Sequence, residues 1–333
     1  MASPRYDILA IGNALVDVLC QKEDDFVAAQ GLQRGLMQPI DPDRAALLHQ
    51  AMGVCEEVCG GSAANSIAAL AGLGLRLGFI GQTGDDRLGR MFAGDMVAGG
   101  IDFPLKPIDV PTGRCLIIVS PDGHRTMNTA MGASEFLSAG FDPALAAEAK
   151  ILFVEGYMWR TEQPRAASRA ALEVARAAGR RTAFSLSSEY CVHTHHDDFV
   201  TLIEAGLVDI LLANEGELAE LSRLSDFEAG VAWASARVPL LVATRGAEGA
   251  IAVERGQRFE TPAEPQGPVV DTTGAGDLFA AGVLAGLATG RDLPTCLRMG
   301  SIAAGRIIGV MGPRLPVGED LAGLIAARLA QRL

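Results

Sequence analysis

Residues 151–186 read ILFVEGYMWRTEQPRAASRAALEVARAAGRRTAFSL, and this stretch establishes the fold class. Its two ends, 151–154 and 182–186, are short continuous apolar runs that predict buried strands. Between them, residues 165–178 have the apolar spacing of a helix. Buried strands separated by helices are typical of a parallel sheet that is covered on both faces. The stretch therefore predicts an α/β fold.

The same alternation extends in both directions along the chain, although the C-terminal third is expected to be mostly helical. Further strands are expected at 6–11, 75–80, 208–212 and 240–243, and further helices at 63–71, 88–97 and 199–205.

Two irregular pieces, residues 14–58 and 101–130, interrupt this alternation. In the second piece, 114–120 and 125–129 are extended runs on either side of a turn signal, which predicts a hairpin. We therefore expect a single domain over residues 1–333, built on a doubly wound, mostly parallel sheet with helices on both faces. The two irregular pieces are expected to form a small β-rich lid.

The composition excludes several classes of partner. The chain has 28 Lys and Arg residues against 40 Asp and Glu residues, a formal net charge of -12. Such a charge repels nucleic acid and anionic membrane surfaces, whereas a small phosphate-bearing ligand responds to local dipoles and is not excluded. The N-terminus lacks signal-peptide features, and the apolar run 278–287 falls short of the roughly 20 residues of a membrane-spanning helix. A cytoplasmic protein with no membrane partner is expected.

Residues 271–277, DTTGAGD, directly precede that apolar helical run. A helix N-terminus offers unpaired amides and the positive end of the helix dipole, which suit a phosphoryl group, and glycine allows close backbone approach. A carboxylate in the same place, Asp277, can accept the proton of an attacking hydroxyl. A helix start that is merely capped by Asp and Thr is the alternative.

A second string, GGSAAN at residues 60–65, also precedes a predicted helix. The two strings resemble the two signatures of the ribokinase (PfkB) family of carbohydrate and nucleoside kinases, and they occur in the family's order. The resemblance implies a ribokinase-like fold, MgATP as donor, and transfer to a primary hydroxyl of a small molecule. It further implies that Asp277 is the catalytic base and that the amides of Gly274, Ala275 and Gly276 form the anion hole.

The acceptor is expected at the second string and at the end of the first strand. Gly60 and Gly61 allow a substrate ring to lie against the backbone, and Asn65 offers a donor and an acceptor to hydroxyls. Asn13 and Asp17 follow the first strand at the edge where such sheets bind ligands, and their arrangement is similar to that of adenosine kinases. A plain turn after the strand is the alternative.

Residues for ATP and its metal are expected on later loops. Asn214 and Glu217 resemble the family's N-x-x-E motif, which is associated with Mg²⁺ and phosphate; a capped helix start is the alternative. Two protein oxygens that act partly through water are adequate for Mg²⁺. Thr244 and Gly246, with Gly249 behind them, are similar to the family's stretch beside the nucleotide.

Another cation is needed beside the phosphates, because the chain has no G-x-x-x-x-G-K-[ST] string and thus no P-loop lysine. Arg125 matches a position where adenosine kinases carry an arginine near the transferring phosphate. An arginine in a lid would couple lid closure to catalysis. A solvated strand arginine is the alternative.

The acceptor itself is less sharply defined. The N-terminal motif, the hairpin and the stretch 155–158 are more similar to adenosine kinases than to ribokinases or fructokinases, so adenosine is the leading substrate, with Met131 and Tyr157 among the residues for its pocket. Thr273 is also assigned to ATP binding. Many sugar kinases carry threonine at this position of the anion loop, so a sugar kinase is the second interpretation. A binding regulator without the chemistry is the third. Dependence on K⁺ and the choice between monomer and homodimer stay open.

Overall fold

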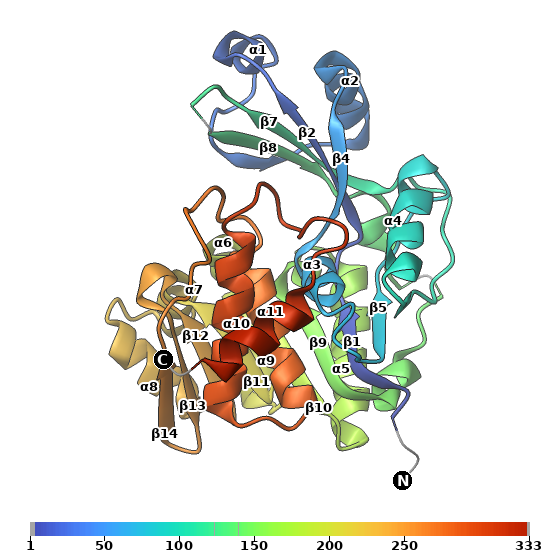
Figure 1. Ribbon diagram of the computed structural model, residues 1–333. Coiled ribbons are helices and arrows are strands. Elements are labelled where there is room, and N and C mark those ends of the chain that lie inside the picture. The colour runs from blue at the N-terminus through green and yellow to red at the C-terminus, as the bar shows by residue number, and fades with distance from the viewer. Residues whose placement is uncertain (1–3, 123, 139, 332–333) are drawn as a thin grey trace.

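The computed structural model describes residues 4–122, 124–138 and 140–331 (Figure 1). Its larger sheet has nine strands in the order β14-β13-β12-β11-β10-β9-β1-β5-β6. Neighbouring strands from β12 to β6 are parallel, and β13 and β14 are antiparallel to their neighbours. The strands are β1 (Tyr6–Ile11), β5 (Leu77–Ile80), β6 (Ile101–Asp102), β9 (Ala149–Glu155), β10 (Arg181–Ser185), β11 (Ile210–Asn214), β12 (Leu240–Thr244), β13 (Ala250–Glu254) and β14 (Gln257–Thr261).

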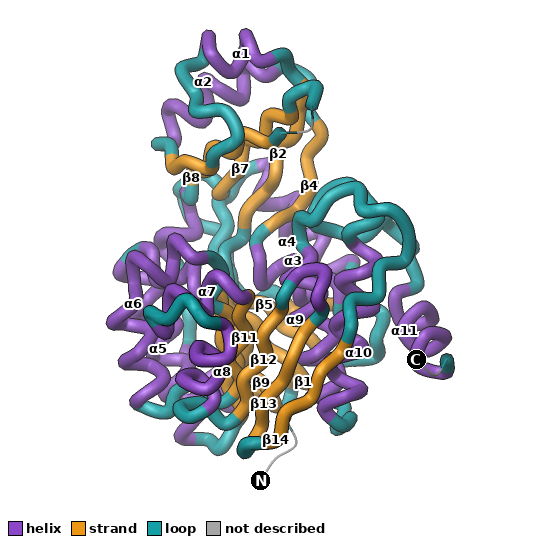
Figure 2. Tube along the Cα trace, turned by 90° about the vertical axis from the view of Figure 1, so that its left-hand side faces the viewer, coloured by secondary structure: helices purple, strands orange, loops and turns teal. Residues whose placement is uncertain are grey.

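Helices cover both faces of this sheet (Figure 2). On β1, Ile8 and Ala10 pack toward one group of helices, whereas Leu9 and Ile11 pack toward the other, because successive side chains of a strand point to opposite faces. The first group is α3 (Ser62–Ala69), α4 (Arg87–Ala98), α9 (Ala275–Ala288), α10 (Leu293–Ile307) and α11 (Leu321–Ala330), and the second is α5 (Glu162–Ala177), α6 (Glu189–Glu204), α7 (Glu215–Ser222) and α8 (Phe227–Ser235).

A second, five-stranded sheet with the order β3-β8-β7-β2-β4 stands at one end of the molecule (Figure 1). Two helices pack on one of its faces and share a small apolar core that includes Val16, Val18, Leu48 and Leu116. Since β2 follows β1 directly, this smaller sheet lies beyond the carboxyl edge of the larger one. Its elements are β2 (Leu15–Gln21), α1 (Asp24–Ala29), β3 (Met37–Pro39), α2 (Pro42–Met52), β4 (Glu56–Gly60), β7 (Gly113–Val119) and β8 (Arg125–Ala130).

The structure confirms the α/β fold with a mostly parallel sheet, and β7 and β8 form the expected antiparallel hairpin. One expectation is wrong: the second lid piece does not begin at residue 101, because β6 pairs with β5 in the larger sheet. The regular structure of the C-terminal third is mostly helical, as expected, but it also contains the hairpin of β13 and β14, whose second strand is polar and largely exposed.

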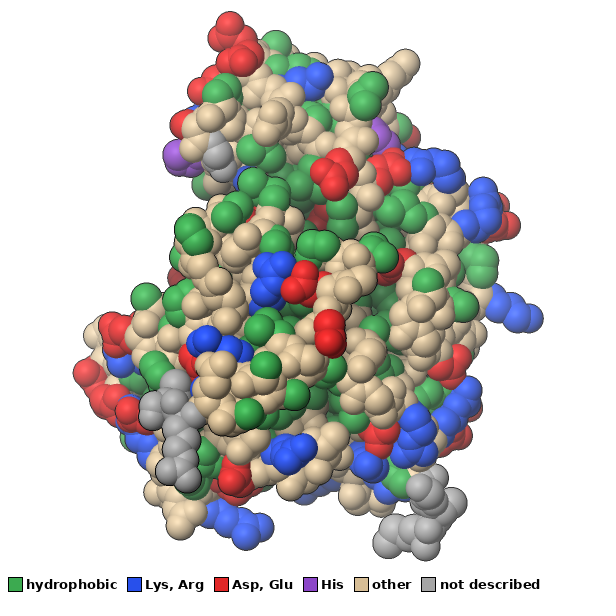
Figure 3. Space-filling view, in the orientation of Figure 1, with side chains coloured by type: hydrophobic (Ala, Val, Ile, Leu, Met, Phe, Trp, Pro, Cys, Tyr) green, Lys and Arg blue, Asp and Glu red, His purple; other side chains and the backbone are tan. Residues whose placement is uncertain are grey.

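The surface carries mixed charge on the face shown in Figure 3, where Lys and Arg side chains are scattered among Asp and Glu rather than gathered into one patch. Among the described helices, none is long and apolar enough to cross a membrane.

Candidate active site

The loop 271–277 leads into the N-terminus of α9. Gly274 has φ = 80°, and a Cβ at this position would lie 2.7 Å from the carbonyl oxygen of Pro313, so glycine is required there. The amide of Ala275 donates to the carbonyl of Thr272 at 3.2 Å, whereas the amide of Gly276 makes no hydrogen bond to any described residue. The anion hole expected from residues 274–276 therefore has one of its three amides already engaged inside the loop.

Asp277 lies in the first turn of α9 and is held by the GGSAAN string. Its Oδ1 accepts from Ser62 Oγ at 2.6 Å and its Oδ2 accepts from Asn65 Nδ2 at 2.9 Å. Burial raises the pKa of Asp277, and the two hydrogen bonds together with the charge of Arg314 oppose that shift. The two strings that were singled out in the sequence are thus joined at this carboxylate.

Two adjoining cavities open beside Asp277. One, of about 360 Å³, is lined by Asp277, Ser62 and the loops after β11 and β12. The other, of about 500 Å³, lies between the loop after β12 and helix α10 and has mostly apolar walls. Of the residues expected to bind ATP, Asn214, Thr244 and Gly246 line the first cavity, and Thr244, Gly246 and Gly249 line the second. Thr273 lines neither, and Thr272 lines the second in its place.

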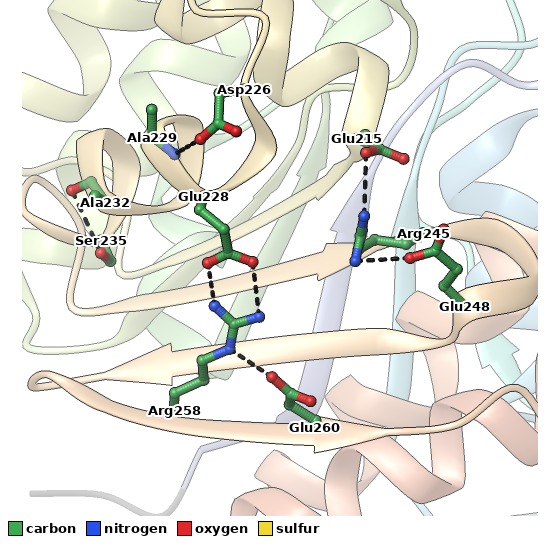
Figure 4. A network of polar contacts seen from close by, with 10 residues as sticks. All are labelled: Glu215, Asp226, Glu228, Ala229, Ala232, Ser235, Arg245, Glu248, Arg258 and Glu260. Atoms are coloured by element: carbon green, nitrogen blue, oxygen red, sulfur yellow. Dashed lines mark hydrogen bonds and ion pairs between the residues drawn. The ribbon is translucent and has the colours of Figure 1, made fainter.

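The loop after β12 is fixed by a polar network (Figure 4). Arg245 forms ion pairs with Glu248 at 2.7 Å and with Glu215 of α7 at 3.5 Å, and its guanidinium lies 4.3 Å from the centre of the Phe227 ring. These contacts tie the turn that lines both cavities to the start of α7. Nothing in the local sequence pattern distinguishes Arg245.

Asn214 and Glu217 form a capping box at the start of α7. Asn214 Oδ1 accepts from the amide of Glu217 at 2.8 Å, and Glu217 Oε2 accepts from the amide of Asn214 at 2.9 Å. Burial raises the pKa of Glu217 to about 7. Within the described ranges, no group of three or more His, Cys, Asp or Glu side chains is placed to hold a metal ion. The capped helix start is therefore present, and both residues also line the cavity beside Asp277.

Asp17 lies on β2 of the smaller sheet, next to Gly60 on β4. A Cβ at Gly60 would lie 2.7 Å from Asp17 Oδ2, so only glycine leaves room for this carboxylate. Burial raises the pKa of Asp17 to about 7, with Arg314 and Arg125 opposing the shift and Asp277 adding to it. Its carboxylate makes no hydrogen bond to a described residue, so it is available to a ligand.

Asn13 is buried against Glu155 at the carboxyl edge of the larger sheet. Glu155 Oε1 accepts from the backbone amide of Asn13 at 2.9 Å and from Asn13 Nδ2 at 2.6 Å, while Oε2 accepts from the amide of Ala63 at 2.7 Å. Burial raises the pKa of Glu155 to about 7. Glu155 thus ties three chain segments together; it belongs to the stretch 155–158 that was singled out in the sequence, but no role of its own was predicted for it.

The two residues assigned to a purine pocket lie at the borders of the site. The hydroxyl of Tyr157 donates to the carbonyl of Ser187 at 3.1 Å, and Ser187 lines the same cavity as Asp277. Met131 is nearly buried just after β8, and a Cβ on Gly113 would lie 2.5 Å from its carbonyl oxygen. No contact in the described structure links Met131 to Asp277.

Arg125 reaches from β8 of the smaller sheet to the loop 271–277. It forms an ion pair with Asp271, and its Nη1 lies 2.9 Å from Thr273 Oγ1. Its side chain is 14% exposed, so the alternative of a solvated strand arginine is wrong. Burial of Asp271 would raise the pKa of that carboxyl, but hydrogen bonds from Gly312 and Thr273, with the charge of Arg125, lower it overall.

Arg314 is a site residue that sequence reasoning missed. It follows α10 in an irregular segment and contacts Asn65, whose side chain in turn contacts Asp277. A single arginine in a loop carries no local pattern, so no signal distinguished it.

Residues 37–319 match the model of the pfkB family carbohydrate kinases. The chain belongs to the PfkB family. It is 41% identical to the adenosine kinase of Sinorhizobium meliloti, whose crystal structure superposes with a TM-score of 0.89 over 98% of this chain and 100% of that one. A probable sugar kinase from Rhizobium etli is 36% identical, with a TM-score of 0.89 over 98% and 99% of the two chains.

A fructokinase of Klebsiella pneumoniae is 34% identical over 237 residues, which cover 69% of this chain and 76% of that protein. PfkB kinases phosphorylate hydroxyl groups of sugars or nucleosides, so this chain is a phosphotransferase with an alcohol group as acceptor. Such kinases use ATP and typically Mg²⁺. The resemblance noted in the sequence is confirmed.

Proposed function

We propose that this protein is a MgATP-dependent nucleoside kinase that phosphorylates the 5'-hydroxyl of adenosine. One observation carries the proposal. Asp277 stands at the N-terminus of α9, lines a cavity suited to the donor, and lies close enough to Asp17 of the smaller sheet for its charge to raise the pKa of that carboxyl. A base that borders both the donor cavity and the acceptor can take the proton of the hydroxyl that attacks the phosphoryl group in line.

The donor phosphates are assigned to the smaller cavity and the nucleoside of ATP to the larger one. The amide of Gly276, which has no hydrogen-bond acceptor within the described ranges, and the dipole of α9 attract negative charge to the first cavity. The apolar walls of the second cavity suit a base and ribose. Asn214 and Glu217 would hold Mg²⁺, partly through water, and the ion would neutralise charge on the transferring group.

The acceptor hydroxyl is assigned to the space that Asp17 and Asp277 border. Asp17 has no hydrogen-bond partner among the described residues and would accept hydrogen bonds from ribose hydroxyls, as Gly60 leaves it room to do. Asp277 would take the proton of the attacking hydroxyl. Its raised pKa favours this role, because a base is most effective when its pKa approaches the working pH.

Arg125 would complete the site when the smaller sheet acts as a lid. It already bridges that sheet to Asp271 and Thr273 of the anion loop. A cation at this position stabilises negative charge on the phosphoryl group, and closure of the sheet excludes water from ATP.

Adenosine is favoured over a sugar by the full-length likeness to the Sinorhizobium meliloti adenosine kinase, which exceeds the partial likeness to the fructokinase. A sugar kinase is the second candidate, supported by the Rhizobium etli protein and by Thr273. A binding regulator is disfavoured because Asp277 keeps both of its hydrogen-bond donors.

ADP release with MgATP and a panel of adenosine, guanosine, ribose and fructose tests the proposal. Turnover with adenosine at the highest kcat/KM supports it, turnover with a sugar supports the second candidate, and no turnover supports a regulator. Asp277→Asn should lower kcat by about 100-fold or more. Asp292→Asn, a like substitution at the N-cap of α10, is the matched control and should leave kcat unchanged. Running the assay in K⁺ and in Na⁺ shows whether the activity depends on the monovalent cation.

A further inference from the structure

The segment that follows α10 crosses the site and touches it at consecutive residues. The amide of Gly312 donates to Asp271 Oδ2 at 2.7 Å, the next residue, Pro313, packs on the anion loop, and Arg314 Nε donates to Asn65 Oδ1 at 3.1 Å. The segment therefore connects the loop before α9 with helix α3, which carries Asn65.

Arg314 is the end point of this connection. Its side chain is 11% exposed and forms an ion pair with Asp95 of α4. Its Nη2 is buried and makes no hydrogen bond to a described residue. The guanidinium is thus kept beside the site although one of its buried donors has no partner among the described residues, which costs free energy.

The contact fixes which way the Asn65 amide points. Arginine has only donors and a carboxylate has only acceptors, so Asn65 must turn its Oδ1 to Arg314 and its Nδ2 to Asp277. Without Arg314 the Asn65 amide would be held at its Nδ2 end alone and would be free to tilt away from the carboxylate. The hydrogen bond that orients Asp277 would then be weaker and less directional.

We propose that Arg314 is the positioning residue of the catalytic base, acting through Asn65. The inference rests on the proposed role of Asp277. Arg314 holds the Asn65 amide in the orientation that donates to Asp277 Oδ2, and this aims the other carboxylate lone pairs at the acceptor hydroxyl.

The positive charge of Arg314 also supports a role in keeping Asp277 ready to act as the base. Three acidic groups from other elements interact electrostatically with Asp277, namely Asp17 of β2, Glu155 of β9 and Glu217 of α7. The Tyr157 hydroxyl interacts with Asp277 and Glu155 in the same way. The guanidinium opposes them and lowers the pKa of Asp277 against its burial. The base is thereby kept able to accept a proton.

The test compares kcat for Arg314→Met, Arg314→Lys, Asn65→Ser and the double variant Asn65→Ser/Arg314→Met, with ADP binding as a check that each is folded. We expect Arg314→Met to lower kcat by about 10-fold or more with KM for MgATP within about twofold, and Arg314→Lys to restore part of the loss. The double variant should be no slower than the slower single variant, because both changes break one chain of contacts.

Arg306→Met is the matched control. It also removes an arginine from an ion pair near the C-terminal segment, with Glu319 at 2.8 Å, but it has no contact with Asn65. Its kcat should stay within about twofold of wild type.

A near-normal kcat for Arg314→Met, effects that multiply in the double variant, or loss of ADP binding in Arg314→Met would each overturn the inference. If Asp277→Asn keeps near-normal transfer, the proposed function fails. If Asp277→Asn loses transfer while Arg314→Met keeps it, the proposed function stands and only the role of Arg314 fails.

Discussion

Gly61→Ala should damage the site through one backbone clash. Gly61 has φ = 98°, and a Cβ there would lie 2.1 Å from the carbonyl oxygen of Asn13. Neither Asn13 nor Gly61 can move freely. Asn13 makes two hydrogen bonds to Glu155, and Gly61 is followed directly by Ser62, which is hydrogen-bonded to Asp277. The substitution must therefore shift either the end of β1 or the first turn of α3.

Gly72→Ala separates this clash from backbone strain. Gly72 also has a positive φ, 82°, but a Cβ there would meet nothing within 4 Å. The left-handed conformation alone costs about 1–2 kcal/mol for alanine. In Gly61→Ala the overlap between the new Cβ and the carbonyl oxygen of Asn13 should add about 2 kcal/mol or more to this conformational cost, because both sides of the contact are held by backbone. For a chain of 333 residues, this corresponds to a fall in Tm of about 2 °C for Gly72→Ala and about 5 °C for Gly61→Ala.

Thermal melts and kinetics with the best acceptor measure both effects. Gly61→Ala should lower kcat by about 10-fold or more, because Ser62 and Asn65 would no longer hold Asp277 in place, whereas Gly72→Ala should leave kcat within about twofold. Equal losses of Tm in the two variants, or an unchanged kcat in Gly61→Ala, would refute the reasoning.

Two further outcomes are expected. Asp17→Asn should raise the free energy of unfolding by about 1–3 kcal/mol more at pH 8 than at pH 5, and it should weaken binding of the acceptor. Burial raises the pKa of Asp17 to about 7, so the free-energy cost of its ionised form in the folded protein grows as the pH rises toward that value. Urea unfolding curves that shift equally at both pH values would contradict this. Ala304→Phe, in the wall of the larger cavity, should raise KM for MgATP at least about tenfold and leave KM for the acceptor within about twofold; equal changes in both would place ATP elsewhere.

Much of the fold was readable from local pattern. The apolar runs that became β1, β9, β10, β11 and β12 are short and continuous, because strands buried on both faces have no polar side to show. The β13–β14 hairpin was missed because its second strand, β14, is a polar and largely exposed edge strand, although β13 is a buried apolar run like the others.

The sequence by itself also determined the family and the candidate base, because a helix N-terminus with two glycines and a carboxylate is a local feature. What only the tertiary structure decided is how that base is held. Ser62 and Asp277 are 215 positions apart, and Asn65 and Arg314 are 249 apart. Hydrogen bonds over such separations depend on how the smaller sheet, α3 and the C-terminal segment pack together, and no periodicity along the chain records that packing.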